Sequence, residues 1–195
     1  MNQETRMIRL VGCGILRKET DFLISKNGWQ VDAHYLQSSL HNYLARLKTT
    51  LVDVLNKNDK ENRETVVFYG ACHPQMDTLL QERRLHRTEG QNCIVMLLGY
   101  ERFMDELSHG AYFLLEDWAL TWEPLLTGIF GNNIMVIREI FHSSHKYILA
   151  IRTPCSSDFT EAAEAAARFV DLPLSWTETG LDHLESVLST ALGKN

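Results

Sequence analysis

Apolar positions along the chain alternate between short compact runs and longer runs with helical spacing. Compact runs bounded by turn residues are typical of buried strands, and apolar residues recurring every three or four positions are typical of helices with one buried face. The strongest helical pattern predicts a helix over residues 40–56, where the recurring apolar residues are Leu40, Leu44, Leu47, Leu51, Val54 and Leu55.

The same patterning predicts further strands and helices along the whole chain. Strands are expected over residues 7–11, 29–36, 65–69, 85–88, 111–115, 147–151 and 174–177. Further helices are expected over residues 16–26, 74–83, 93–107, 158–170 and 181–192. Residues 118–140 are aromatic and irregular, with helix expected only in their second half, and residues 142–145 resemble a loop. This alternation predicts an α/β fold, a single domain over residues 1–195 with a mostly parallel sheet and helices on both faces.

Composition and charge narrow the class of protein. Of 195 residues, 45% are hydrophobic and 23% are charged, which suits a globular chain with a sizeable core and excludes disorder. The net charge of −6 disfavours binding to nucleic acid and to anionic membranes. No apolar run approaches the roughly 18 residues that span a bilayer, and the first residues lack the layout of a signal peptide. We therefore expect a cytoplasmic protein whose four cysteines are reduced, metal-bound or reactive.

Each cysteine lies at a predicted strand end or helix start. Cys13, Cys72 and Cys155 follow predicted strands, and Cys93 opens a predicted helix that Asn92 is placed to cap. The carboxyl ends of parallel strands share one edge of a sheet, where ligands bind. We therefore expect Cys13, Cys72 and Cys93 to converge at that edge, with Cys155 near the same edge. Convergent thiolates select zinc, cuprous copper or iron–sulfur clusters, whereas the alternative interpretation is that of buried structural thiols.

Short motifs do not decide between these interpretations. No Cys-x-x-Cys pair occurs, so local spacing does not identify a metal. The glycines at positions 12 and 14 lack the third glycine of a dinucleotide-binding fingerprint, and there is no phosphate loop, nucleophile elbow or His-Glu-x-x-His motif. His73, next to Cys72, and Cys155 are the candidates for a fourth ligand.

Five segments around the cysteines carry a family resemblance. They are Cys-Gly-Ile-Leu at residues 13–16, Leu-His at 40–41, Phe-Tyr-Gly-Ala-Cys-His-Pro at 68–74, Gln-Asn-Cys-Ile at 91–94 and Gly-Ala-Tyr-Phe-Leu at 110–114. In order and spacing they resemble the prokaryotic family called domain of unknown function 1638, which occurs in anaerobic bacteria and archaea. The resemblance implies a site made of Cys13, Cys72 and Cys93, and an association with corrinoid-dependent methyl transfer.

Two departures from the family pattern concern the neighbours of these cysteines. Relatives have Gly-Asn after the second cysteine, where this chain has His73 and Pro74. Relatives have His-Asp before the third cysteine, where this chain has Gln91 and Asn92. Any role of the family histidine is therefore absent here or is taken over by His73.

Three functions remain open from the sequence. The first is a cysteine-ligated iron–sulfur cluster, a 4Fe-4S centre with one open iron, working with a redox or corrinoid partner protein. The second is a zinc–thiolate centre for methyl transfer, in which His73 is a ligand. The third is a metal-free protein that binds a small molecule or partner through aromatic residues between Tyr112 and Trp122.

Overall fold

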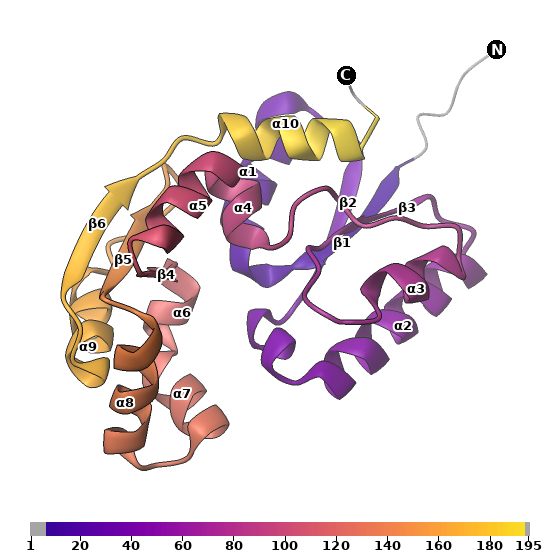
Figure 1. Cartoon of the computed structure of the whole chain (residues 1–195). Helices are drawn as coiled ribbons and strands as arrows, with labels where there is room; N and C mark the ends of the chain where they lie inside the picture. The colour runs from indigo at the N-terminus through magenta and orange to yellow at the C-terminus, as the bar shows by residue number, and fades with distance from the viewer. Residues whose placement is uncertain (1–6, 194–195) are drawn as a thin grey trace. The chain divides into compact units, whose positions relative to one another are not determined.

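The computed structural model describes residues 7–193, and these residues form an α/β structure of two compact units (Figure 1). Unit 1 comprises Met1–Leu97 together with Asp182–Asn195, and unit 2 comprises Leu98–Leu181. Each unit contains a parallel sheet of three strands among the described residues. The α/β class predicted from the sequence is confirmed.

The sheet of unit 1 has the strand order β2-β1-β3, with all neighbours parallel. Its strands are β1 (Ile8–Cys13), β2 (Val31–Leu36) and β3 (Thr65–Phe68). Cys13 pairs in register with Leu36 of β2, and Gly12 pairs with Phe68 of β3. The carboxyl ends of the three strands therefore lie along one edge, beside the loops that carry Cys72 and Cys93.

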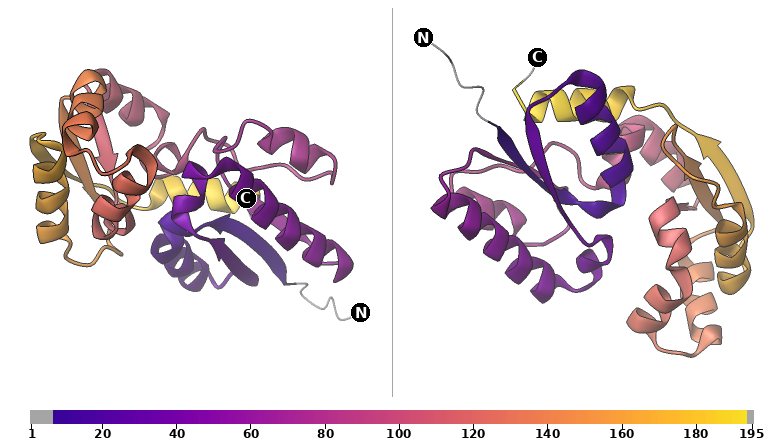
Figure 2. Two further views of the ribbon diagram at one scale, coloured as in Figure 1. Left: turned by 90° about the horizontal axis from the view of Figure 1, so that it is seen from below. Right: turned by 180° about the vertical axis from the view of Figure 1, so that it is seen from behind.

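Helices cover both faces of this sheet. They are η1 (Gly14–Leu16), α1 (Arg17–Asn27), η2 (Ser38–Asn42), α2 (Leu44–Lys60), α3 (Met76–Gln81), α4 (Cys93–Leu98) and α10 (Asp182–Ala191). On one face, Val11 and Val67 of the sheet belong to a buried cluster with Leu51 of α2 and Met76 of α3. On the other face lie α1 and α10 (Figure 2). An ion pair of 2.7 Å between Lys26 and Glu185 joins these two helices.

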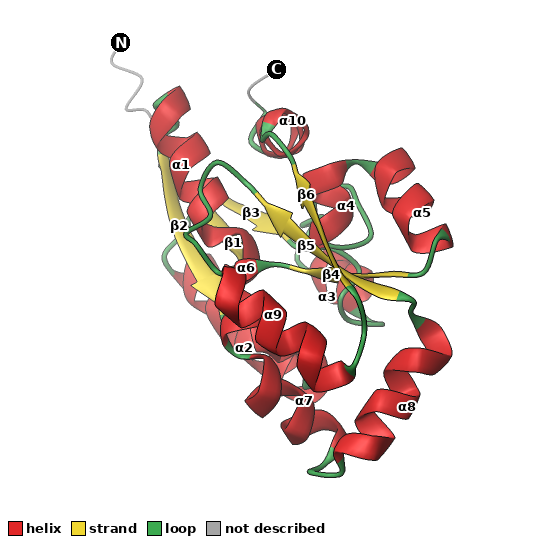
Figure 3. Ribbon diagram, turned by 90° about the vertical axis from the view of Figure 1, so that its left-hand side faces the viewer, coloured by secondary structure: helices red, strands yellow, loops and turns green. Residues whose placement is uncertain are grey.

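Strands and helices alternate in unit 2 as well (Figure 3). The strands β4 (Ala111–Leu114), β5 (Tyr147–Arg152) and β6 (Leu174–Glu178) are parallel in the order β4-β5-β6. The helices are α5 (Tyr100–Ser108), α6 (Glu116–Leu120), α7 (Trp122–Phe130), α8 (Ile134–Ser144) and α9 (Thr160–Val170).

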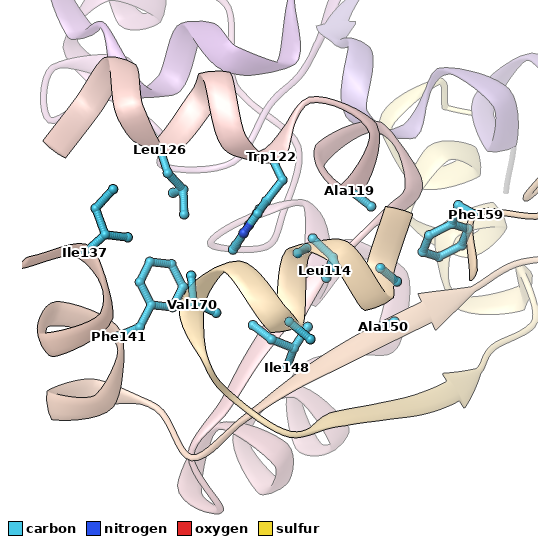
Figure 4. Packing of buried hydrophobic residues seen from close by; sticks show 13 residues of the cluster. Leu114, Ala119, Trp122, Leu126, Ile137, Phe141, Ile148, Ala150, Phe159 and Val170 are labelled. Carbon is cyan, nitrogen blue, oxygen red and sulfur yellow. The ribbon is translucent and has the colours of Figure 1, made fainter. Parts of the chain in front are cut away.

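The core of unit 2 is formed where α6, α7, α8 and α9 pack on one face of this sheet. Figure 4 shows Trp122 and Phe141 between the helices, with Ile148 of β5 and Val170 of α9 close by. The Trp122 and Phe141 rings meet edge-on with centroids 5.6 Å apart. On the other face, Phe103 of α5 stacks on Phe113 of β4 at 5.1 Å. Trp122 thus contributes to the core, not to an open binding surface.

The structure corrects the predicted number of sheets. The sequence predicted one sheet, and among the described residues the strands form two. The prediction was wrong because apolar runs indicate strands but do not specify which strands pair. The single domain over residues 1–195 stays a prediction. Within residues 7–193, no helix has both the length and the apolar character needed to cross a membrane.

Several element boundaries also differ from the sequence prediction. Residues 116–144 form three helices, and residues 142–144 lie within α8, where a loop was expected. The Asn133 side chain accepts a hydrogen bond from the Met135 N–H at 3.1 Å and so caps α8. The helix predicted over residues 93–107 is interrupted at Gly99, whose φ of 82° is left-handed. Residues 85–88 contribute a single bridge, between Val67 and Arg87, and no strand.

The environment of His145 in unit 2 makes the stability of the protein depend on pH. Its ring lies 5.0 Å from that of Tyr112, and burial lowers its pKa. The unfolded chain takes up this proton near pH 6.5, whereas the folded chain takes it up at a lower pH. The stability that His145 contributes is therefore complete above about pH 6.5 and is lost as the pH falls through the folded pKa.

We therefore expect the unfolding free energy to decrease on acidification from pH 7.5 to 5.5, with a smaller slope in His145→Gln. Urea titrations at each pH measure this slope. His86→Gln, which changes an exposed histidine, is the control and should keep the wild-type slope. Burial lowers the pKa of His41 too, so part of the slope should remain. An unchanged slope in His145→Gln would contradict the prediction.

Candidate functional site

Three of the four cysteines lie where the strands of unit 1 end. Cys13 is the last residue of β1, Cys72 lies in the loop after β3, and Cys93 is the first residue of α4. Cys13 and Cys72 both pack against the buried cluster between the sheet and α2. None of the four cysteines, all within residues 7–193, forms a disulfide. The parallel order of the strands thus supplies the shared edge that the sequence predicted for these three thiols.

A contact between two loops holds the start of α4 against the end of β3. The Ala71 N–H donates a hydrogen bond to the Gln91 carbonyl at 2.8 Å. A Cβ atom at Gly70 would clash with that same carbonyl oxygen, so only glycine fits there. The Asn92 side chain accepts a hydrogen bond from the Val95 N–H at 2.9 Å, which confirms the predicted N-cap of α4.

The ionisation of Cys93 depends on the other two thiols. Burial raises the pKa of Cys93, and negative charge on Cys13 and on Cys72 raises it further. The backbone N–H groups of Cys93 and Ile94 partly offset these effects. Cys13 and Cys72 are therefore within electrostatic reach of Cys93, and without a cation the Cys93 thiol resists ionisation.

Arg87 supplies positive charge to the same edge. Burial raises the pKa of Cys72, while the Gly70 N–H and the charge of Arg87 lower it. The guanidinium is held in place by Asp77, whose carboxylate accepts from Nε at 2.8 Å, and by the Thr88 and Gly90 carbonyls. Arg87 is thus a fixed charge beside Cys72, and the sequence analysis did not single it out.

Tyr69 is a second residue that the sequence analysis missed. It follows β3 directly, and the register that pairs Gly12 with Phe68 places it level with Cys13. Its side chain is only 2% exposed, and its hydroxyl completes no hydrogen bond within the described structure. Burial raises the pKa of Tyr69, as do the charge and hydrogen-bonding capacity of the adjacent Cys13 and the charges of Cys72 and Cys93. An aromatic residue at a strand end looks like an ordinary core residue in sequence, so no local signal marked it.

His73 is buried next to Cys72, but its ring is already engaged. Nδ1 accepts a hydrogen bond from the Gln75 N–H at 3.0 Å, which places the ring proton on Nε2. Metal binding through Nε2 needs the lone pair of that nitrogen, so this tautomer does not suit a ligand. His41 has the opposite arrangement, because its Nδ1 donates to the Ser38 carbonyl at 2.7 Å.

Cys155 lies in unit 2, between β5 and α9, and its N–H donates to the Thr153 hydroxyl at 3.1 Å. The expectation that all four cysteines follow one sheet edge was therefore wrong, because β5 belongs to the other sheet. A role for Cys155 as fourth ligand stays a prediction.

The donor set of unit 1 suits a thiophilic metal centre, since it combines three sulfur atoms with the unsatisfied hydroxyl of Tyr69. No three His, Cys, Asp or Glu side chains within residues 7–193 already surround a point that a single metal ion could occupy. Binding therefore requires the thiols to draw together around one ion or to bind separate irons of a cluster.

Comparison with known families gives a match over residues 35–188 to the family described as Protein of unknown function (DUF1638). The chain belongs to this family. The matched region contains Cys72, Cys93 and Cys155, whereas Cys13 precedes it. The resemblance to this family is thus confirmed over residues 35–188. Neither a curated protein nor a solved structure matches the chain.

The contact at Gly70 leads to a stability prediction. In Gly70→Ala, the new methyl group meets backbone atoms of Gln91 and Asn92, which cannot move aside as a flexible side chain can. We expect a loss of about 1–3 kcal/mol in unfolding free energy, measured by urea titration of the metal-free protein. Gly12→Ala is the control, because its new Cβ meets neighbours at 3.4 Å and should cost much less. Equal losses in the two variants would contradict the loop contact.

Proposed function

We propose that this protein binds a metal centre through Cys13, Cys72 and Cys93, and that the centre is an iron–sulfur cluster of the 4Fe-4S type. The observation that carries the proposal is the placement of these three cysteines at the carboxyl end of one parallel sheet, where Cys13 and Cys72 act electrostatically on Cys93. Their burial and mutual repulsion disfavour thiolates in the metal-free protein. A bound cation removes this repulsion, because thiolate is the ligand form of cysteine.

The composition of the donor set favours iron–sulfur over zinc. The alternative zinc centre uses His73 as a ligand, and the hydrogen bond from Gln75 to Nδ1 holds that ring in an unsuitable tautomer. Three cysteines leave one iron of a 4Fe-4S cluster without a protein thiolate. In the proposal, that open position would be available to a substrate or to a group from a redox or corrinoid partner protein. A reducing cytoplasm suits four cysteines without disulfides.

Single cysteine substitutions test the ligand set. After anaerobic reconstitution, the wild-type protein should contain iron and sulfide and absorb in the region of thiolate-to-iron charge transfer. Cys13→Ser, Cys72→Ser and Cys93→Ser should each lose most of the iron, because each removes one of three protein ligands. Cys155→Ser, in unit 2, is the matched control and should retain the cluster. A wild-type protein that holds neither iron nor zinc would overturn the proposal.

The His73→Gln variant separates the iron–sulfur and zinc interpretations. Glutamine keeps an oxygen that can accept the Gln75 N–H, and we expect the variant to retain wild-type metal content. Metal analysis of the protein as isolated and after reconstitution provides the measurement. Zinc in the wild-type protein, together with its loss in His73→Gln, would instead establish the zinc centre with His73 as a ligand.

A further inference from the structure

The hydroxyl of Tyr69 is a buried donor with no completed hydrogen bond in the described structure. Burying a hydroxyl without a partner is unfavourable, so a native protein retains such a group where something else satisfies it. Removing the hydroxyl would leave a phenylalanine, which suits the apolar cluster of α2 and α3 around the ring. Packing in the apolar cluster therefore accounts for the aromatic ring of Tyr69 but not for its hydroxyl.

The strand register identifies the partner. Gly12 pairs with Phe68, so the next residues along the parallel strands, Cys13 and Tyr69, lie side by side. Both contribute to the same buried face, because Tyr69 belongs to the cluster that Cys13 packs against. Cys13 is the side chain within hydrogen-bonding range of the Tyr69 hydroxyl, and Cys72 and Cys93 lie within electrostatic reach of it. The hydroxyl is thus a hydrogen-bond donor that lies beside the sulfur of Cys13.

We propose that Tyr69 is a positioning residue of the thiolate centre, whose hydroxyl donates a hydrogen bond to the Cys13 sulfur when that sulfur ligates metal. This inference rests on the proposed function, since it is metal binding that makes Cys13 a thiolate. A thiolate accepts a hydrogen bond far better than a thiol does, because the acceptor carries charge. Hydrogen bonds to the sulfurs of an iron–sulfur cluster favour its reduced, more negative state and so raise its reduction potential.

The test compares Tyr69→Phe with wild type in the metal-free and the reconstituted full-length protein. Without metal, Tyr69→Phe should unfold at an equal or higher temperature, because the variant lacks an unsatisfied buried hydroxyl. With the cluster bound, its reduction equilibrium should shift about tenfold toward the oxidised state, which is about 59 mV lower in potential for one electron. Tyr35→Phe is the matched control, because the Tyr35 hydroxyl donates to Asp21 at 2.6 Å. Its potential should equal that of wild type.

The outcomes for Tyr69→Phe test the role of Tyr69, and metal uptake by the wild-type protein tests the proposed function. An intact cluster with an unchanged potential in Tyr69→Phe overturns the role of Tyr69 and leaves the cluster in place. A metal-free Tyr69→Phe that is less stable than wild type, or that fails to fold, also overturns it, because the hydroxyl then has a partner without metal. Selective loss of the cluster from a folded Tyr69→Phe supports the inference. A wild-type protein that takes up no metal refutes the proposed function and this inference with it.

Discussion

The parallel pairing of β1 with both β2 and β3 is the constraint on which the candidate site depends. Parallel neighbours bring their carboxyl ends to one edge, so the chain leaves the sheet three times in the same region. Cys13 ends the central strand, and Tyr69 stands beside it at the end of β3. An antiparallel β3 would remove Tyr69 and Cys72 from this edge, and no contact between loops could restore them.

The contact between Gly70 and Gln91 adds the third thiol to this arrangement. It joins the loop after β3 to the residues before α4, although some 20 residues of chain separate the two in sequence. The segment between them is tied to β3 as well, because Thr88 donates from its N–H to Val67 and from its hydroxyl to the Tyr69 carbonyl. These backbone contacts therefore hold the start of α4, and with it Cys93, at the site.

The resulting environment opposes negative charge until a cation is present. Burial and the charges of Cys13 and Cys72 raise the pKa of Cys93. Burial also raises the pKa of Cys72, and the positive charge of Arg87 offsets only part of this effect. In a low-dielectric site, an unpaired thiolate is costly, and so is an unpaired hydroxyl. A bound metal would neutralise the Cys13 thiolate, and that thiolate would accept the hydrogen bond that the Tyr69 hydroxyl lacks. The unsatisfied hydroxyl is in this way linked to the proposed metal binding.

The sequence by itself determined the local structure and the positions of the cysteines within it. The spacing of Leu47, Leu51 and Leu55 indicated α2, the side chain of Asn92 indicated the start of α4, and Cys13, Cys72 and Cys93 were placed at strand ends or a helix start. These features depend on periodicity and capping, which act over a few residues.

Only the tertiary structure decided which strands pair, and hence that two sheets form and that Cys155 belongs to the second. It also decided the tautomer of His73 and the burial of the Tyr69 hydroxyl without a completed hydrogen bond. Strand partners, register and close backbone contacts join residues far apart in the chain, and hydrophobic patterning specifies burial without specifying the partner.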